Sequence, residues 1–288
     1  MTAPATHTIS SLTEFTQLVE QLLLASRNKY SSDPLIVNWY RGVGKANSHR
    51  LVPTLYRHPT EKISNELLKL ERVMLERFRR ESILHQTVTR FMEPEDPDFE
   101  LLFFMQHYSV PTRLLDWTMN PYIGLYFAVT SAEFDDKANE FKEDAAVWVL
   151  NPTAWNEQAL DHVSWGARGE LSISDLERDG YAPRKNINTV HLAGMYEFPA
   201  AMRGIANSTR MFAQKGVFTV FGRNTSPMEE IFDTKNYPKE SLTKIVIDKK
   251  DIAALTDSVL SIGYTDSVSY PDLHGVAMEM RRSYGFKV

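Results

Sequence analysis

A dense group of polar, charged and aromatic residues lies between two apolar segments in the middle of the chain. It reads Gln106-His107-Tyr108-Ser109-Val110-Pro111-Thr112-Arg113-Leu114-Leu115-Asp116-Trp117-Thr118, after the apolar run 101–105 and before the apolar run 122–129. Buried polar groups cost free energy unless they have hydrogen-bond partners. The segment is therefore expected either to form an internal network or to line a pocket.

Three side chains of this segment could take part in chemistry. An unperturbed histidine titrates near neutral pH, so His107 is a candidate base or partner for a sugar hydroxyl. The alternative is that His107 is a core residue with satisfied hydrogen bonds. Arg113 and Asp116 could form an ion pair that only holds the loop under the following helix, in which case both residues are architectural.

A second candidate lies at the end of a predicted buried strand, in Tyr40-Arg41-Gly42-Val43-Gly44. Glycine allows a ligand to approach the backbone closely, and the guanidinium group of arginine offers a planar fork of donors suited to phosphate. The alternative is that Arg41 pairs with a buried carboxylate and the glycines form a turn.

Composition excludes several classes of protein. The net charge of −5 in 288 residues argues against a surface that binds nucleic acid as a whole, but it allows a local basic groove. The absence of cysteine excludes disulfides, thiolate metal sites and cysteine nucleophiles. The histidines have no metal-ligand spacing, and no Walker A, G-x-S-x-G or G-x-G-x-x-G motif is found, so no metal site is expected. Without a signal-like start or an apolar run of span length, the expectation is a cytoplasmic protein with no membrane contact.

Periodicity and capping residues predict a single mixed α+β domain. A tail and one helix are expected in residues 1–30, the main domain in 31–288, and an insertion or lid in 156–198. In the helix predicted for 61–81, Ile63, Leu67, Leu70, Met74 and Phe78 form an apolar stripe, and the basic interval from Arg72 to Arg80 is expected to be exposed. Further helices are expected to start at Ser11, after a loose tail, at Pro97 and at Asn120-Pro121, and a short helix is expected at 252–260. Strands are expected at 35–42, 145–150, 216–222 and 242–247, and a charged loop at 135–144.

The sequence resembles the FRG domain family, which is named for a Phe-Arg-Gly signature. Here the signature is Tyr40-Arg41-Gly42, and the segment Leu51-Val52-Pro53-Thr54-Leu55-Tyr56-Arg57 is similar to the next family element. Residues 106–128 resemble the central family motif almost residue for residue, with Ser109 and Gly124 as departures. Further similarities at 210–218 and 270–275 extend the resemblance to about residues 35–280. The family resemblance by itself implies little about function.

A second resemblance, to ADP-ribosyltransferases of the Arg-Ser-Glu type, implies chemistry with NAD as substrate. Arg41 matches the arginine that holds NAD in those enzymes, and residues 112–128 are similar to their second motif and its helix. Gly216 stands where their catalytic glutamate is expected. The resemblance implies that Arg41, beside Gly42, contacts phosphate and that Gln106 and His107 contact ribose. It implies ring stacking for Trp117 or Tyr126 and action at the anomeric carbon for Asp116 or Gln214. Further cofactor contacts are implied for Thr112, Arg113, Thr118 and Arg210.

Two functions therefore stay open at this point, and the acidic net charge weighs against a third, an RNA-directed enzyme. The first is an ADP-ribosyltransferase-like domain with strands flanked by helices. It would transfer ADP-ribose to a protein or nucleic-acid acceptor, or hydrolyse NAD. Its biological role would be that of a toxin or phage-defence effector, with an inhibitory or partner protein. The second is a catalytically inactive domain that binds protein or nucleic acid, which the missing glutamate favours. An active enzyme would need another carboxylate in the cleft, and Asp116 and Asp272 are the candidates.

Overall fold

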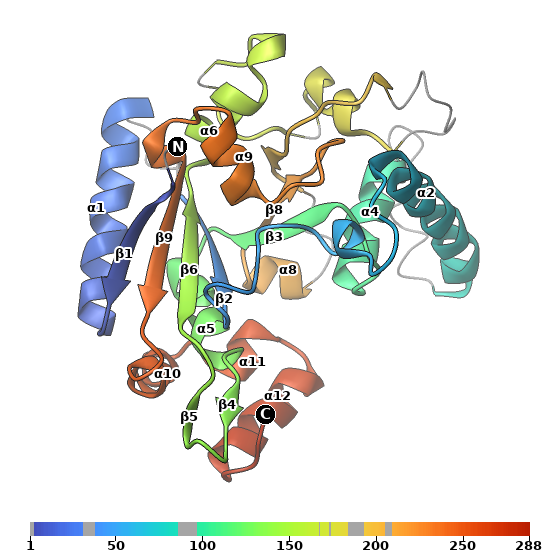
Figure 1. Ribbon diagram of the computed structural model, residues 1–288. Helices are drawn as coiled ribbons and strands as arrows, with labels where there is room; N and C mark the ends of the chain where they lie inside the picture. The colour runs from blue at the N-terminus through green and yellow to red at the C-terminus, as the bar shows by residue number, and fades with distance from the viewer. Residues whose placement is uncertain are drawn as a thin grey trace.

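The central feature of the computed structural model is a seven-stranded mixed sheet (Figure 1). The structure describes residues 3–30, 38–85, 97–166, 168–172, 174–183, 193–204 and 209–288. In spatial order the strands are β1 (Ala5–Ile9), β9 (Leu242–Ile247), β6 (Ala145–Leu150), β2 (Trp39–Val43), β3 (Leu114–Thr118), β8 (Gly216–Val220) and β7 (Ala200–Met202). The pair β1–β9 is parallel and the other neighbouring pairs are antiparallel. The predicted single α+β domain is confirmed.

Helices cover both faces of the sheet. One face is covered by α1 (Leu12–Tyr30), α5 (Pro121–Thr130) and α10 (Ile252–Ser261), whose apolar residues share a core cluster with the strands. The other face and the β7 end of the sheet carry α2 (Ser64–Glu81), α4 (Pro97–His107), α6 (Pro152–Ala159) and α9 (Met228–Thr234). The remaining elements are α8 (Thr209–Ala213), α11 (Asp266–Ser269), α12 (Leu273–Ser283), the hairpin strands β4 (Phe134–Asp135) and β5 (Glu140–Phe141), and the 3-10 helices Leu55–Arg57, Ser82–Leu84, Asp161–Val163, Leu176–Tyr181 and Lys239–Ser241.

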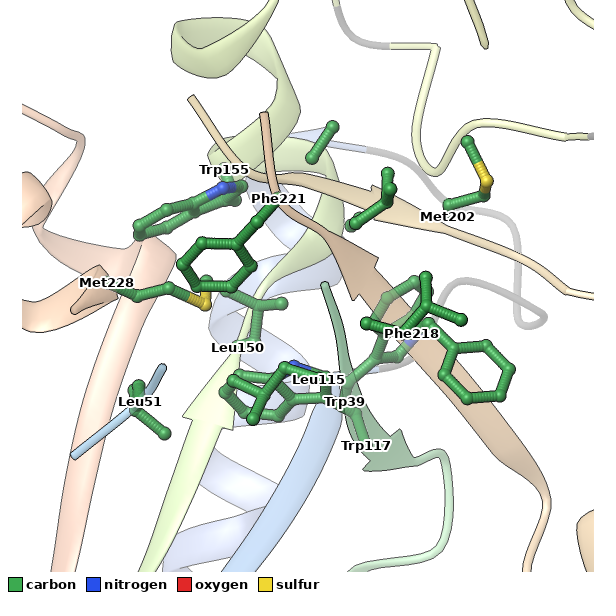
Figure 2. Close-up of a cluster of buried hydrophobic side chains, with 14 of the residues drawn as sticks. Trp39, Leu51, Leu115, Trp117, Leu150, Trp155, Met202, Phe218, Phe221 and Met228 are labelled. Carbon is green, nitrogen blue, oxygen red and sulfur yellow. The ribbon is translucent and has the colours of Figure 1, made fainter. Parts of the chain in front are cut away.

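The core is divided by the sheet, and β6 shows how. Its six residues are all buried, and they alternate between the two core clusters because successive strand side chains point to opposite faces. The larger cluster contains Trp39, Trp117 and Trp155, and Figure 2 draws these side chains together with other members of the cluster. Burial of side chains this large contributes strongly to the stability of the fold.

Several local predictions are confirmed. The side chain of Asn120 accepts hydrogen bonds from the amides of Tyr122 and Ile123, with Pro121 at the first helical position of α5. Helix α4 begins at Pro97, and β6 and β9 have the predicted bounds. Glu14 in the first turn of α1 accepts a hydrogen bond from the Ser10 amide at 2.7 Å, as a capping carboxylate does.

Three predictions about elements are wrong. The supposed loose tail forms β1, which pairs with β9 from Ala5 to Ile9. The supposed charged loop at 135–144 contains the β4–β5 hairpin, which Phe134 and Phe141 stabilise by an edge-to-face contact. The apolar stripe of α2 holds from Leu67 onward, but Ile63 lies before the helix and is exposed, and within the basic interval Arg72 is buried and pairs with Asp98 at 2.8 Å.

The segment 156–198 is built into the core where the structure describes it. Trp165, Leu171 and Tyr181 belong to the larger core cluster, and Asn156 donates to the carbonyl groups of Gly169 and Ala201. None of its described residues lines the pocket described below. Residues 167, 173 and 184–192 lie outside the described residues, and a lid function for the segment stays a prediction.

Candidate functional site

A pocket of about 540 Å³ opens where the sheet divides between β2 and β3. These two strands share one bridge, Tyr40 to Thr118, whereas β2 pairs with β6 and β3 pairs with β8 along their lengths. Beyond the bridge the two strands separate, and both contribute to the wall. The lining residues are Tyr40, Arg41, Gly42, Val43, His49, Arg50, Thr54, Arg57, Gln106, His107, Ser109, Val110, Asp116, Trp117, Thr118, Phe127, Ser131, Arg210, Met211, Gln214 and Phe218.

The pocket wall is strongly cationic in a chain of net charge −5. Among the described residues it carries the guanidinium groups of Arg41, Arg50, Arg57 and Arg210 against the single carboxylate of Asp116. Arg50 is neutralised outside the pocket, since it donates to Glu229 and to Glu230. Within the part of the chain that the structure describes, the other three arginines have no carboxylate at ion-pair distance, so the site favours an anionic ligand.

Arg41 sits at the point where the strands separate. Its Nη1 donates to the backbone carbonyl of Asp116 at 2.7 Å and so connects β2 to β3 beyond their single bridge. Its buried Nε has no hydrogen-bond partner among the described residues. Burial lowers the pKa of Arg41, and the negative charge of Asp116 only partly compensates. A buried cation in this state gains free energy when an anion binds beside it.

Asp116 is the one carboxylate on the described wall, and a relay of side chains orients it. The Nε2 of Gln106 donates to its Oδ2 at 2.7 Å, and the hydroxyl of Thr112 donates to the Oε1 of Gln106. The side chain of Asp116 is open to the pocket, yet the surrounding walls reduce its solvation. This loss of solvation raises the pKa of Asp116, although Arg41, the Gln106 hydrogen bond and Arg210 act in the opposite direction.

The raised pKa of Asp116 predicts how stability depends on pH. A carboxyl group with a raised pKa in the folded state stabilises the fold while it is protonated, and this contribution is lost as the pH rises through the folded-state pKa. Asp116→Asn removes the ionisation, so we expect the variant to be more stable than the wild type at pH 7. The difference should shrink as the pH falls toward the ordinary aspartate pKa of about 3.9. Urea unfolding of both proteins between pH 3 and 8 measures this difference in stability. A variant less stable than the wild type at pH 7 would contradict a raised pKa for Asp116.

The predicted ion pair between Arg113 and Asp116 is wrong. Arg113 is fully buried, and its Nε donates to Glu71 at 2.9 Å, while its other donors reach the carbonyl groups of Tyr181 and Phe221. The reason is strand alternation, which directs Arg113 into the core and leaves Asp116, three positions later, on the pocket face. Arg113 does not line the pocket.

Two further residues predicted to contact the cofactor lie away from the pocket wall. Thr112 is buried and acts on the site only through Gln106. Tyr126 is buried on the opposite face of the sheet, where its hydroxyl donates to Asp266 at 2.5 Å. A ring in that position has no access to the pocket for stacking.

Three predicted contacts lie on the wall but have structural partners. Trp117 is only 3% exposed, and its indole Nε1 donates to Thr219 at 3.1 Å, so it forms part of the pocket floor. The Thr118 hydroxyl donates to the carbonyl of Gln214 at 2.6 Å. Gly42 makes room for helix α5, because a Cβ there would lie 2.0 Å from the carbonyl oxygen of Gly124.

The remaining predicted site residues meet on the wall near α8. His107 and Gln214 line the pocket, and the Nε2 of Gln214 donates to the carbonyl of Ser269 at 2.8 Å. Arg210 lies with its guanidinium carbon 4.4 Å above the ring of Tyr270. Burial lowers the pKa of His107, and the charge of Arg210 adds to this effect. His107 is thus biased toward its neutral form, which can accept a proton or a hydrogen bond.

Asp272 does not supply the second carboxylate. It is the N-cap of α12, where its Oδ1 accepts a hydrogen bond from the Gly275 amide at 3.1 Å, and it is outside the pocket lining. Helix capping is the physical reason for an aspartate at this position.

Sequence reasoning assigned no role to Arg57 and His49, which also line the pocket. The signal for Arg57 is its place at the end of the segment 51–57, which resembles a family element. The 3-10 helix Leu55–Arg57 ends there, and Arg57 donates to Thr54 at 2.8 Å. No motif marks His49, which reaches the pocket through the loop after β2.

Ser109 departs from the family glycine at a position where glycine is favoured. It has φ of 60°, and the amide of Val110 donates to the carbonyl of Met105 while the Ser109 amide donates to Gln106, as in a Schellman motif. The left-handed conformation costs a non-glycine residue about 1–2 kcal/mol.

Ser109→Gly is therefore expected to raise the free energy of unfolding by up to about 1 kcal/mol, after the greater flexibility of glycine in the unfolded chain is subtracted. Ser109→Ala is the matched control, because alanine keeps the strain and should change stability little. Urea denaturation measures both, and a less stable glycine variant would refute the assignment.

Comparison with known proteins finds one family match. Residues 37–137 match the family model of the FRG domain, in agreement with the motifs of this segment. The match covers β2, α4, β3 and α5 and thus much of the pocket wall, whereas the similar segments at 210–218 and 270–275 lie outside it. The resemblance to ADP-ribosyltransferases is not shown by any comparison. No curated protein and no solved structure matches the chain.

Two further observations concern metals and membranes. Within the described residues, no group of three or more histidines or carboxylates is placed to hold a metal ion. Within the same residues, every helix is too short or too polar to cross a membrane.

Proposed function

We propose that this FRG domain binds NAD in the pocket between β2 and β3 and breaks the bond between nicotinamide and ribose. The observation that carries the proposal is the set of three guanidinium groups, Arg41, Arg57 and Arg210. They have no carboxylate partner among the described residues and share the described pocket wall with one carboxylate. The two phosphates of NAD supply the matching negative charge, and Arg41 and Arg57 would hold them.

The chain contributes one oriented carboxylate to the proposed reaction. The bond from ribose C1′ to the pyridine nitrogen breaks, and nicotinamide leaves with the bonding electron pair. A water molecule or an acceptor atom then forms a bond to C1′ and gives up its proton. Asp116, held by Gln106 and with its pKa raised above the ordinary value by loss of solvation, would take this proton, which is the role of a general base.

A binding module without catalysis is the second candidate, and one position favours it. Gly216 begins β8 opposite Thr118 and offers no side chain where a transferase would present its catalytic glutamate. The two candidates share ligand binding but differ in nicotinamide release. The same proposal includes a macromolecular acceptor for ADP-ribose and a cytoplasmic location. It also includes an inhibitory partner protein and a role as a toxin or phage-defence effector.

Arg41→Lys tests the proposal. Lysine keeps the charge but loses the bidentate fork, so NAD affinity should fall at least about tenfold, equivalent to about 1.4 kcal/mol. The free energy of unfolding should change by only about 1 kcal/mol, since one hydrogen bond to the Asp116 carbonyl is weakened. Calorimetric titration with NAD and mass spectrometry of released nicotinamide measure the two activities.

The matched control is Arg77→Lys, because Arg77 is exposed on α2 and, among the described residues, pairs with Glu81 alone. It should leave NAD affinity and nicotinamide release unchanged. Binding without nicotinamide release would support the inactive module. Loss of the fold in Arg41→Lys would instead mark Arg41 as architectural.

A further inference from the structure

The pocket wall formed by α8 carries one cation, Arg210. Arg210, Met211 and Gln214 reach the pocket from α8 and the turn before β8, whereas Arg41 comes from β2 and Arg57 from the 3-10 helix that ends there. Arg210 therefore comes from a different wall than Arg41 and Arg57, and Asp116 from β3 belongs to the same pocket.

Arg210 is held in place by stacking. Its guanidinium carbon lies 4.4 Å above the Tyr270 ring, and this ring is itself fixed by an edge-to-face contact with Phe127 at 5.9 Å. Stacking uses the face of the guanidinium group and leaves its in-plane donors available. Among the described residues, no acceptor takes these donors. A half-buried, prearranged arginine of this kind suits a phosphate group.

Two exposed aromatic rings follow residues that line the pocket, Phe212 near Arg210 in the sequence and Tyr108 beside His107, whose ring lies 4.9 Å from it and is acted on by the charge of Arg210. Phe212 is 77% exposed and lies on α8 between Met211 and the turn that carries Gln214. Tyr108 is 56% exposed and lies between His107 and Ser109, which both line the pocket. Lys215 follows in the same turn and is exposed. Large exposed aromatic rings beside basic groups are the features that bind single-stranded nucleic acids, because every base has a face to stack.

We propose that a single-stranded nucleic acid binds at this side of the pocket, with Arg210 of the lining on a backbone phosphate and the exposed rings of Phe212 and Tyr108, which follow lining residues in the chain, on bases. The assignment of this nucleic acid as the acceptor for ADP-ribose rests on the proposed function, whereas its binding does not. The net charge of −5 agrees with a local site, since a surface binding nucleic acid as a whole would be basic.

The test is fluorescence anisotropy with labelled single-stranded RNA and DNA oligonucleotides at low salt. Arg210→Ala and Phe212→Ala should each weaken binding by about tenfold, as expected for the loss of a phosphate contact or one stacked base. Arg77→Ala removes an equally charged but exposed residue on α2 and should leave binding unchanged apart from a small salt-dependent effect. The unfolding temperature of each variant confirms that the fold is retained.

The outcomes separate this inference from the proposed function. If the Phe212→Ala variant loses oligonucleotide binding but keeps NAD binding, the result supports the inference. Oligonucleotide binding with the same dependence on Arg210 and Phe212, in a protein that does not bind NAD, supports the inference and refutes the proposed function. Equal weakening by Arg77→Ala, no oligonucleotide binding, or preferential binding of an acidic peptide that depends on Arg210 would overturn it.

Discussion

Replacing Arg113 by alanine is expected to lower the free energy of unfolding by about 3–5 kcal/mol, because it leaves a buried carboxylate without its partner. Glu71 is only 2% exposed and accepts from both the Nε and the backbone amide of Arg113. The same substitution also leaves the carbonyl groups of Tyr181 and Phe221 without a donor. Urea unfolding monitored by tryptophan fluorescence measures the loss.

Two matched variants make this result specific. Arg77→Ala removes an arginine from an exposed pair with Glu81, so it should cost less than about 1 kcal/mol. Removing both buried charges, in Arg113→Met with Glu71→Met, should recover part of the stability lost by Arg113→Ala. A loss for Arg113→Ala as small as that for Arg77→Ala would show that the buried pair does not hold the fold.

Gly42→Ala is expected to lower the free energy of unfolding by about 3 kcal/mol or more, at the upper end of the cost of overpacking. Its Cβ would lie 2.0 Å from the Gly124 carbonyl oxygen and 2.4 Å from the Ala128 amide nitrogen. Both atoms belong to the backbone of α5, so the helix must move away from β2. Since Gly42 and Phe127 line the pocket, ligand binding should be lost together with stability.

Gly216→Ala is the control for this steric argument. Its Cβ would meet no atom closer than the Met211 carbonyl oxygen at 3.6 Å, an ordinary contact distance. Alanine is favoured over glycine in a strand by about 0.5–1 kcal/mol, so this variant should be as stable as the wild type or slightly more stable. Similar destabilisation by both alanine variants would mean that the sheet rejects any side chain, and the packing explanation would fail.

Local signals explain which parts of the fold are predictable from the sequence. Strands β6 and β9 are apolar runs with clear ends, and α5 begins at asparagine followed by proline, so neighbouring residues determine them. Strand β1 depends on pairing with β9, more than two hundred residues later. Its own residues are mostly exposed and polar, and the same pattern is typical of a tail.

The candidate site is predictable as a set of residues but not as a set of contacts. The motif 106–118 marks Gln106, His107, Asp116 and Thr118, and all four line the pocket. The partner of Arg113 is not predictable because Glu71 comes from the buried face of α2, a separate element forty-two positions earlier. Long-range pairs of this kind depend on how α2 packs against α4, which periodicity alone does not reveal.

The central claim is that the pocket between β2 and β3 recognises the phosphates of NAD through Arg41 and its neighbouring arginines. The most direct measurement is calorimetric titration of the full chain with NAD, ADP-ribose and nicotinamide riboside, which lacks the pyrophosphate. We expect NAD and ADP-ribose to bind, the riboside to bind at least about tenfold more weakly, and Arg41→Lys to abolish most of this difference. Equal affinity for NAD and the riboside, or no binding of NAD by the folded protein, would contradict the claim.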